Sequence, residues 1–233
     1  HAPDATWSPH HPCEYLFRMI AVLILTLVAL NLGFRLGMRY NLRLAASVRA
    51  ELEQRFQPQE AEWTPAGFGV GWGFELALGG DITSLSGILT TLPRYQILYL
   101  PIARLLGRGD LLKLVFHVSD TIPPGVGSIV RESARGSRWH AVERDADWRQ
   151  ETVNEGSDRY RLFAFNPLVF ARLRDALPRF GAITGLHQVS IDSRAGTVTA
   201  FLRPERDTLT QDLERVESLI FSLTTPPSRG RLQ

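Results

Sequence analysis

The chain is 233 residues long and 44% hydrophobic, which is enough apolar material for a folded body with a core and excludes a disordered polymer. Its 26 basic and 24 acidic residues leave a formal net charge of only +2, so nucleic-acid binding has little support. The one cysteine, Cys13, excludes an internal disulfide or a cysteine metal site. The first residue is His1 rather than Met, which predicts either a removed targeting segment or an engineered form.

An uncharged apolar run, Met19–Phe34, is the clearest feature of the first part of the chain. Arg18 and the two apolar residues before it extend the run to nineteen residues if the arginine side chain reaches back to the membrane surface. The hydrocarbon core of a bilayer requires roughly 20 helical residues and tolerates about 17. We therefore predict a short tail at 1–13 and a transmembrane helix over 14–40. The alternatives are a buried helix of a soluble domain and an uncleaved signal core.

Basic residues are unevenly distributed around this run. Arg35, Arg39 and Arg43 follow it, whereas Arg18 is the only base before it. Because the cytoplasmic flanks of membrane helices are enriched in Lys and Arg, this asymmetry predicts that the long C-terminal part lies on the cytoplasmic or topologically equivalent side.

Small residues recur every fourth position along the predicted membrane helix, at Ala29, Gly33 and Gly37. Such spacing places them on one helix face, where they allow the backbone of another helix to approach closely. Asn31 adds a polar group that would need a partner in lipid. The pattern predicts that this face packs against a helix of another membrane protein.

The helical period continues beyond the run. Leu42, Ala45, Val48 and Leu52 share one stripe, with arginines elsewhere. This pattern predicts a juxtamembrane helix over 41–57 that continues the membrane helix.

The rest of the sequence predicts a globular domain over 58–225 and a short tail at 226–233. Alternating glycines at 67–73 are typical of a strand with one bare face, and the apolar stretch 85–106 is interpreted as a broken helix. The other predicted segments are a turn between Pro58 and Pro65, strands at 111–119, 125–133 and 159–166, a polar loop region at 134–158, a helix from Pro167, a hairpin at 193–196 and a helix over 208–223. Strands with a few covering helices indicate an α+β fold with a mixed or antiparallel sheet.

The polar residues form no recognisable catalytic or ligand-binding motif. Adjacent His10 and His11 supply too few metal ligands, and Asp145 and Asp147 lack the other positions of a calcium loop. A basic, aromatic cluster is nearly cancelled by interspersed acids; its members are Arg131, Arg135, Arg138, Trp139, Arg144, Trp148 and Arg149. The strand-like surroundings of His117 and His187 suggest structural histidines. We therefore expect no catalytic residue, cofactor or metal site.

The order of several short motifs resembles the calumin family, which are endoplasmic-reticulum membrane proteins with a coiled-coil tail that belong to the PAT complex of the multipass translocon. The motifs are Glu14-Tyr15-Leu16, then Asn41-x-Arg43-Leu44-Ala45 in a helix ending at Phe56, then Asp158, Tyr160, Phe163 and Ala164, then Arg172-Leu173, and finally Thr199–Leu202 with Asp212–Leu223. The resemblance implies a membrane-anchored α+β body that scaffolds a membrane-protein chaperone and catalyses nothing. The family's acidic luminal segment and charged C-terminal coil have no counterpart here, so calcium binding and ribosome contact are not implied.

These features predict a non-catalytic, single-pass accessory or scaffold subunit of a multi-protein membrane complex. Its expected partners are membrane protein subunits and the lipid bilayer, with nucleic acid met only indirectly through a ribosome. The resemblance implies the endoplasmic reticulum; the main alternative is an accessory subunit of a mitochondrial inner-membrane assembly, such as a respiratory one. A second alternative is a membrane-tethered enzyme or lipid-binding domain with a pocket beneath the 67–73 strand.

Overall fold

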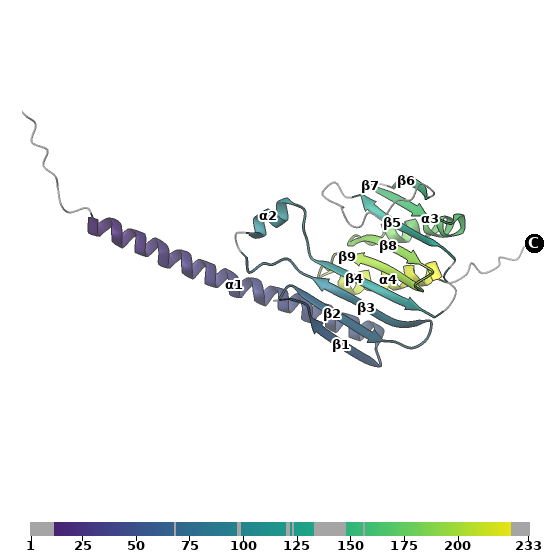
Figure 1. Ribbon diagram of the computed structural model, residues 1–233, viewed down its shortest axis with the longest axis horizontal. Helices are drawn as coiled ribbons and strands as arrows, with labels where there is room; N and C mark the ends of the chain where they lie inside the picture. Colours follow the sequence, from purple (N-terminus) through teal and green to yellow (C-terminus); the bar gives the residue numbers. More distant parts are fainter. Residues whose placement is uncertain are drawn as a thin grey trace, which may run out of the picture.

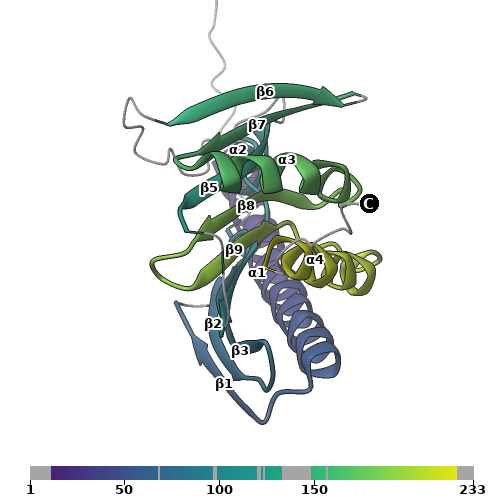
Figure 2. The same ribbon diagram turned by 90° about the vertical axis from the view of Figure 1, so that its right-hand side faces the viewer.

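A computed structural model describes residues 12–67, 69–96, 99–119, 122, 124–132, 148–155 and 157–224. In this part of the chain, one long helix extends from a body built on a nine-stranded antiparallel sheet (Figure 1). The two longer helices of the body, together with the second half of the long helix, cover one face of the sheet (Figure 2). This arrangement confirms the predicted α+β fold.

Along the chain, four helices alternate with groups of two to four antiparallel strands in the described residues. The helices are α1 (Pro12–Phe56), α2 (Tyr99–Leu105), α3 (Pro167–Gly181) and α4 (Leu209–Thr224). The strands are β1 (Glu60–Pro65), β2 (Gly71–Ala77), β3 (Ile82–Thr90), β4 (Leu111–Val118), β5 (Val126–Glu132), β6 (Arg149–Glu155), β7 (Asp158–Ala164), β8 (Leu186–Asp192) and β9 (Thr197–Leu202). Their order across the sheet is β1-β2-β3-β4-β9-β8-β5-β7-β6, so the last strand in sequence joins the two halves of the sheet.

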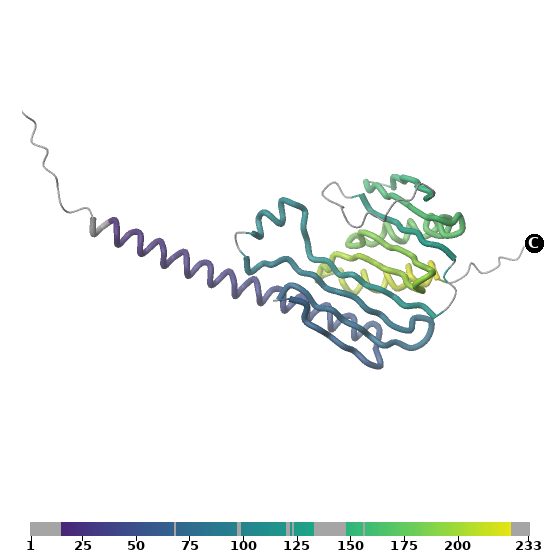
Figure 3. The backbone as a smooth tube through the Cα atoms, viewed as in Figure 1, coloured from purple at the N-terminus to yellow at the C-terminus, as the bar shows by residue number. Residues whose placement is uncertain are grey.

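Helix α1 is one continuous helix that includes both the predicted membrane helix and the predicted juxtamembrane helix (Figure 3). At about 1.5 Å of rise per residue, 45 residues span roughly 70 Å. Its second half buries Leu44, Ala45, Val48 and Leu52 against the sheet and α4. The predicted stripe was therefore correct except for Leu42, which is 50% exposed, because Leu44 occupies the core position instead.

Helices α3 and α4 complete the cover of the sheet. Asn166 caps α3 by accepting a hydrogen bond of 2.8 Å from the backbone N–H of Leu168, and Pro167 begins the helix where no intrahelical N–H is needed. Helix α4 buries the predicted apolar stripe, which consists of Leu209, Leu213, Val216, Leu219 and Ile220. The short loop between β8 and β9, at Ser193–Gly196, forms the predicted hairpin.

Four sequence interpretations were wrong. The predicted turn between Pro58 and Pro65 contains β1. The predicted strand at 67–73 is instead a turn followed by the start of β2, because Gly67 and Gly69 adopt φ values of +90° and +65°, which are incompatible with a strand. The stretch 85–106, interpreted as a broken helix, begins with the second half of β3, whose isoleucines and leucines fall three or four residues apart, as in a helix. Among the described residues of this stretch, only those of α2, in its last part, are helical. Strand β6 forms at the end of the predicted loop region 134–158.

Candidate functional site at the junction of helix α1 and the sheet

The first half of α1 contacts almost nothing in the body. The most apolar 18-residue window of this helix has 0% of its residues buried, and by length and composition the helix could cross a membrane. Phe17, Leu25 and Leu27 are 75%, 68% and 57% exposed. A fully exposed leucine in water forgoes about 1.5–3 kcal/mol of burial free energy, so covering this surface with apolar groups would be favourable. The described residues do not provide such a cover.

Gly37 ends this exposed half by packing against the chain itself. A Cβ atom at Gly37 would lie 2.4 Å from the carbonyl carbon of Arg94 and 2.5 Å from the amide nitrogen of Tyr95. Only glycine therefore permits the loop after β3 to lie directly against the helix. The prediction that Gly37 belongs to a face for another membrane helix was wrong, because the chain's own backbone occupies that face.

Asn41 holds the same loop from one helical turn further on. It is fully buried, and its Nδ2 donates hydrogen bonds of 2.9 Å to the carbonyl of Leu92 and 3.0 Å to the carbonyl of Gly69. Its Oδ1 accepts a hydrogen bond of 3.0 Å from Nη1 of Arg94. A single buried amide therefore joins α1 to the loops that precede β2 and follow β3.

Arg94 completes this network through a bidentate ion pair with Asp110. The Nη1–Oδ1 and Nη2–Oδ2 distances are 2.8 and 2.5 Å, and Asp110 also accepts the backbone N–H of Leu92 at 2.8 Å. Both side chains are largely buried. Removing one partner of such a pair leaves an uncompensated charge in a poorly hydrated place, which strongly destabilises the surrounding structure.

Aromatic contacts extend the junction on both sides of Gly37. The rings of Phe34 and Tyr95 meet edge to face with centroids 5.6 Å apart, and the guanidinium of Arg94 lies 4.2 Å from the ring centroid of Tyr40. The guanidinium of Arg206, in the loop before α4, lies 5.3 Å from the centroid of the same ring. Contacts at Phe34, Gly37, Tyr40 and Asn41 thus cover two turns of α1 and fix the rotation of the helix relative to the sheet.

The other residues predicted to face a membrane partner remain free of the body. Ala29 and Asn31 are exposed and Gly33 is half-buried. The basic residues Arg35, Arg39 and Arg43 are all exposed, the first two within the junction and the third just after it. The structure therefore leaves Ala29, Asn31 and Gly33 available for a partner but assigns Gly37 to the junction.

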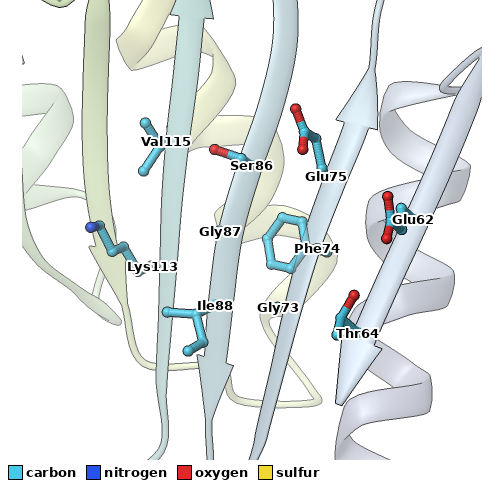
Figure 4. Close-up of a pocket in the computed structure, with 10 residues that line it drawn as sticks. All are labelled: Glu62, Thr64, Gly73, Phe74, Glu75, Ser86, Gly87, Ile88, Lys113 and Val115. Atoms are coloured by element: carbon cyan, nitrogen blue, oxygen red, sulfur yellow. The ribbon is translucent and has the colours of Figure 1, made fainter. Parts of the chain in front are cut away.

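An open depression on the uncovered face of β1–β4 corresponds in part to the pocket expected beneath the 67–73 strand (Figure 4). It has a volume of about 420 Å³, and Gly73 contributes no side chain to this face of the sheet. Glu62, Glu75 and Lys113 surround it. Among the described residues no cluster of three metal-ligating side chains occurs, here or elsewhere.

Arg131 was predicted to belong to an exposed basic cluster, but it is only 6% exposed. It donates hydrogen bonds of 2.5 and 3.0 Å to the carbonyls of Thr184 and Gly181, at the C-terminal end of α3, and lies over the ring of Tyr160. Burial raises the pKa of the Tyr160 hydroxyl, and Arg131 partly offsets that rise. Arg131 is thus a structural cap.

The structure also describes Trp148 and Arg149 of the predicted basic, aromatic cluster. The other members of that cluster, together with His10, His11, Asp145 and Asp147, lie outside the described residues.

Compared with known proteins, the chain matches no family model, and no curated protein is similar to it at a significant level. The calumin-like order of motifs therefore remains a prediction from the sequence. Asn41 is the one residue of that resemblance found at the centre of the junction. The position of Asn41, a polar residue on the apolar stripe of α1, could have indicated its role from the sequence. No sequence motif near Arg94 or Asp110 indicated that these two residues pair.

Proposed function

We propose that this protein is a single-pass membrane protein whose first helical half crosses the bilayer and whose body acts as a non-catalytic accessory or scaffold subunit of a membrane assembly. The observation that carries the proposal is the complete exposure of the apolar half of α1. A soluble protein would bury such a surface, and a lipid bilayer or partner helices would satisfy it.

The junction supports a scaffolding role. The helix is held over two turns by a buried amide, a buried ion pair and aromatic contacts, so the body keeps one orientation relative to the span. Ala29, Asn31 and Gly33 remain available to a partner helix in the bilayer. The exposed arginines Arg35 and Arg39 favour a body on the cytoplasmic or equivalent side.

Alkaline carbonate extraction and protease protection test the membrane assignment. We expect the protein to stay in the membrane pellet at high pH, with its body digested only when the protease is on the side that the arginines indicate. Release into the carbonate supernatant would contradict the assignment.

Purification in a mild detergent tests the subunit role. We expect membrane proteins to accompany this chain in fixed proportion, and their identity decides between the endoplasmic reticulum, which the calumin-like motifs favour, and a mitochondrial inner-membrane assembly. Recovery of the protein alone, as a monodisperse monomer, would contradict the subunit role while leaving the membrane assignment intact.

A further inference from the structure

A second pocket, about 480 Å³ in volume, lies between α2, the residues that follow it and the ends of β8 and β9. Its charged lining consists of Arg94, Arg104, Arg108, Arg203 and Asp110. Four positive charges against one negative charge give the lining a formal charge of +3. A concave, strongly positive surface of this kind fits an anion.

The positive charge of this pocket is not used within the fold. Arg94 is paired with Asp110, whereas the side chains of Arg104 and Arg203 form no ion pair or hydrogen bond with another residue in the part of the chain that the structure describes; their backbone groups bond to Gly107 and Gly185. Arg108 donates a hydrogen bond to the hydroxyl of Tyr99, which leaves most of its guanidinium donors available. Three arginines thus line one space, and the carboxylate in that lining, Asp110, is already paired with Arg94. Arginine forks match the geometry of phosphate oxygens.

His187 on β8 lines the same pocket. Its pKa is lowered, mainly by burial and further by the positive charges of Arg131 and Arg203, so the imidazole is neutral at pH 7. A neutral imidazole can donate one hydrogen bond to an anion without itself adding charge. A bound anion would offset the two arginines and raise this pKa, which makes His187 a reporter of occupancy.

Helix α2, which forms one wall of the pocket, has an apolar face that the body does not cover. Ala103 is fully buried and attaches the helix to the body, whereas Ile102 and Leu105 are 53% and 85% exposed, and Leu106, directly after the helix, is 60% exposed. Apolar side chains beside arginines are typical of segments that lie in the headgroup region of a membrane. The arginines and the apolar face thus suit a single environment, the surface of a bilayer.

The position of α2 relative to α1 agrees with that environment. The loop that leads into α2 contacts α1 at Phe34 and Gly37, where the apolar run ends and the arginines begin. Figure 1 shows α2 at the end of the body nearest the exposed half of α1. If α1 crosses a bilayer, α2 and its pocket lie at the level of the lipid headgroups.

We propose that α2 lies in the surface of the membrane that α1 crosses, and that the pocket behind it binds the phosphate of an anionic phospholipid through Arg104, Arg108 and Arg203. This inference rests on the proposed membrane span. It commits to a lipid rather than a free phosphate, because the apolar face of α2 borders the same pocket and offers a surface for acyl chains.

Thermal unfolding of the full chain in a non-ionic detergent tests the pocket. The probes are dihexanoyl phosphatidylglycerol, dihexanoyl phosphatidylcholine and inorganic phosphate at equal concentration. A ligand that binds only the folded state raises Tm. We expect phosphatidylglycerol to raise Tm clearly, phosphatidylcholine to have little effect and inorganic phosphate to have a smaller effect than phosphatidylglycerol. Equal Tm shifts with phosphatidylglycerol and phosphate would overturn the assignment to a lipid. No Tm shift with either would overturn the proposal that this pocket binds an anion.

A matched pair of double variants locates the binding. Arg104→Gln/Arg203→Gln is expected to weaken the phosphatidylglycerol effect about tenfold or more in concentration, because two charged donors are lost. Arg179→Gln/Arg194→Gln removes the same charge from exposed positions elsewhere and should keep the effect. The pKa of His187, followed by NMR, should rise with phosphatidylglycerol in the control variant only. Equal responses of the two variants would overturn the assignment to this pocket.

A depth measurement tests the placement of α2. Leu105→Cys and Leu168→Cys, each in a Cys13→Ser background, carry a fluorophore in nanodiscs whose lipids bear a nitroxide near the headgroup. Both leucines are exposed, at 85% and 64%, but only Leu105 lies on α2. We expect strong quenching at position 105 and little at 168. Equal quenching in carbonate-resistant protein would overturn the placement of α2 alone, whereas loss of carbonate resistance would overturn the membrane span as well.

Discussion

The two halves of helix α1 have similar local structure and opposite surroundings. In the first half, apolar residues cover the whole circumference and almost all of them are exposed. In the second half, apolar residues occupy one stripe, and that stripe is buried at Leu44, Val48 and Leu52. A helix that is apolar all round suits lipid, and one with a single apolar stripe suits a protein surface. The change from one pattern to the other, between Phe34 and Asn41, marks the boundary between the two environments.

The largest expected effect separates the two halves directly. Val48→Asp places a carboxylate at a fully buried position, so we expect it to unfold the body or lower its free energy of unfolding by about 4 kcal/mol or more, with carbonate resistance retained. Leu25→Asp should do the reverse, because a charge at the centre of a span costs about 2.5–3.5 kcal/mol of insertion free energy. Urea unfolding and carbonate extraction measure the two effects. If both variants lost both properties, the two halves would not be distinct.

The two asparagines of α1 provide the next test. Asn41→Leu removes three hydrogen bonds, leaves the carbonyl of Gly69 without its donor and leaves the carbonyl of Leu92 with only the backbone N–H of Arg94, so we expect a loss of about 2–4 kcal/mol in the free energy of unfolding. Asn31→Leu changes an exposed residue and should leave urea unfolding unchanged. A similar stability for the two variants would show that the buried amide does not hold the junction.

The glycines give a smaller effect of the same kind. Gly37→Ala forces a Cβ against the backbone of Arg94, which must shift, at an expected cost of about 1–3 kcal/mol in unfolding free energy. Gly33→Ala, one helical turn earlier, is the matched control and is expected to leave the unfolding of the body unchanged. If the two glycine variants unfolded at the same urea concentration, the close approach at Gly37 would not contribute to stability.

The smallest effect is a dependence on pH. The folded state lowers the pKa of His187 below its usual value of 6.5, so the unfolded chain takes up a proton first as the pH falls. The contribution of this histidine to stability is therefore complete above pH 6.5 and declines as the pH falls toward the folded-state pKa. His187→Gln should show a smaller decline in Tm than the wild type between pH 7 and pH 5. An identical decline in Tm for the two proteins would show that His187 does not contribute to the pH dependence of stability.

Local patterns in the sequence predicted the elements whose burial follows a simple period. The apolar stripes of α1 and α4, the capped start of α3 and the hairpin between β8 and β9 all formed as expected. Strand β3 was missed because the spacing of its apolar side chains fits both the helical period of 3.6 residues and the strand period of two. Only its pairing with β2 and β4 decides between a helix and a strand.

The junction and the basic pocket could not be predicted from local patterns, because both depend on contacts between distant segments. Gly37 fitted the spacing of a membrane-helix interface, but Arg94, which covers it, lies 57 residues further along the chain and forms no part of that motif. Arg104 and Arg203 come together only because β4 and β9 are neighbours in the sheet. Sequence periodicity indicates which face of a helix is buried, but not what covers it.

If the first half of α1 crosses a bilayer, as proposed, its unbroken course through the junction makes the angle of the body about the membrane normal depend on the number of residues in the span. Each residue of an α-helix turns the chain by about 100° and advances it by about 1.5 Å. One alanine inserted after Leu30 would thus turn the whole sheet by about 100° relative to the helix face bearing Ala29, while leaving every contact within the body intact. Four inserted residues would restore nearly the original direction at the cost of about 6 Å in height. An assembly that depends on the direction in which the body points should therefore tolerate four inserted residues better than one or two.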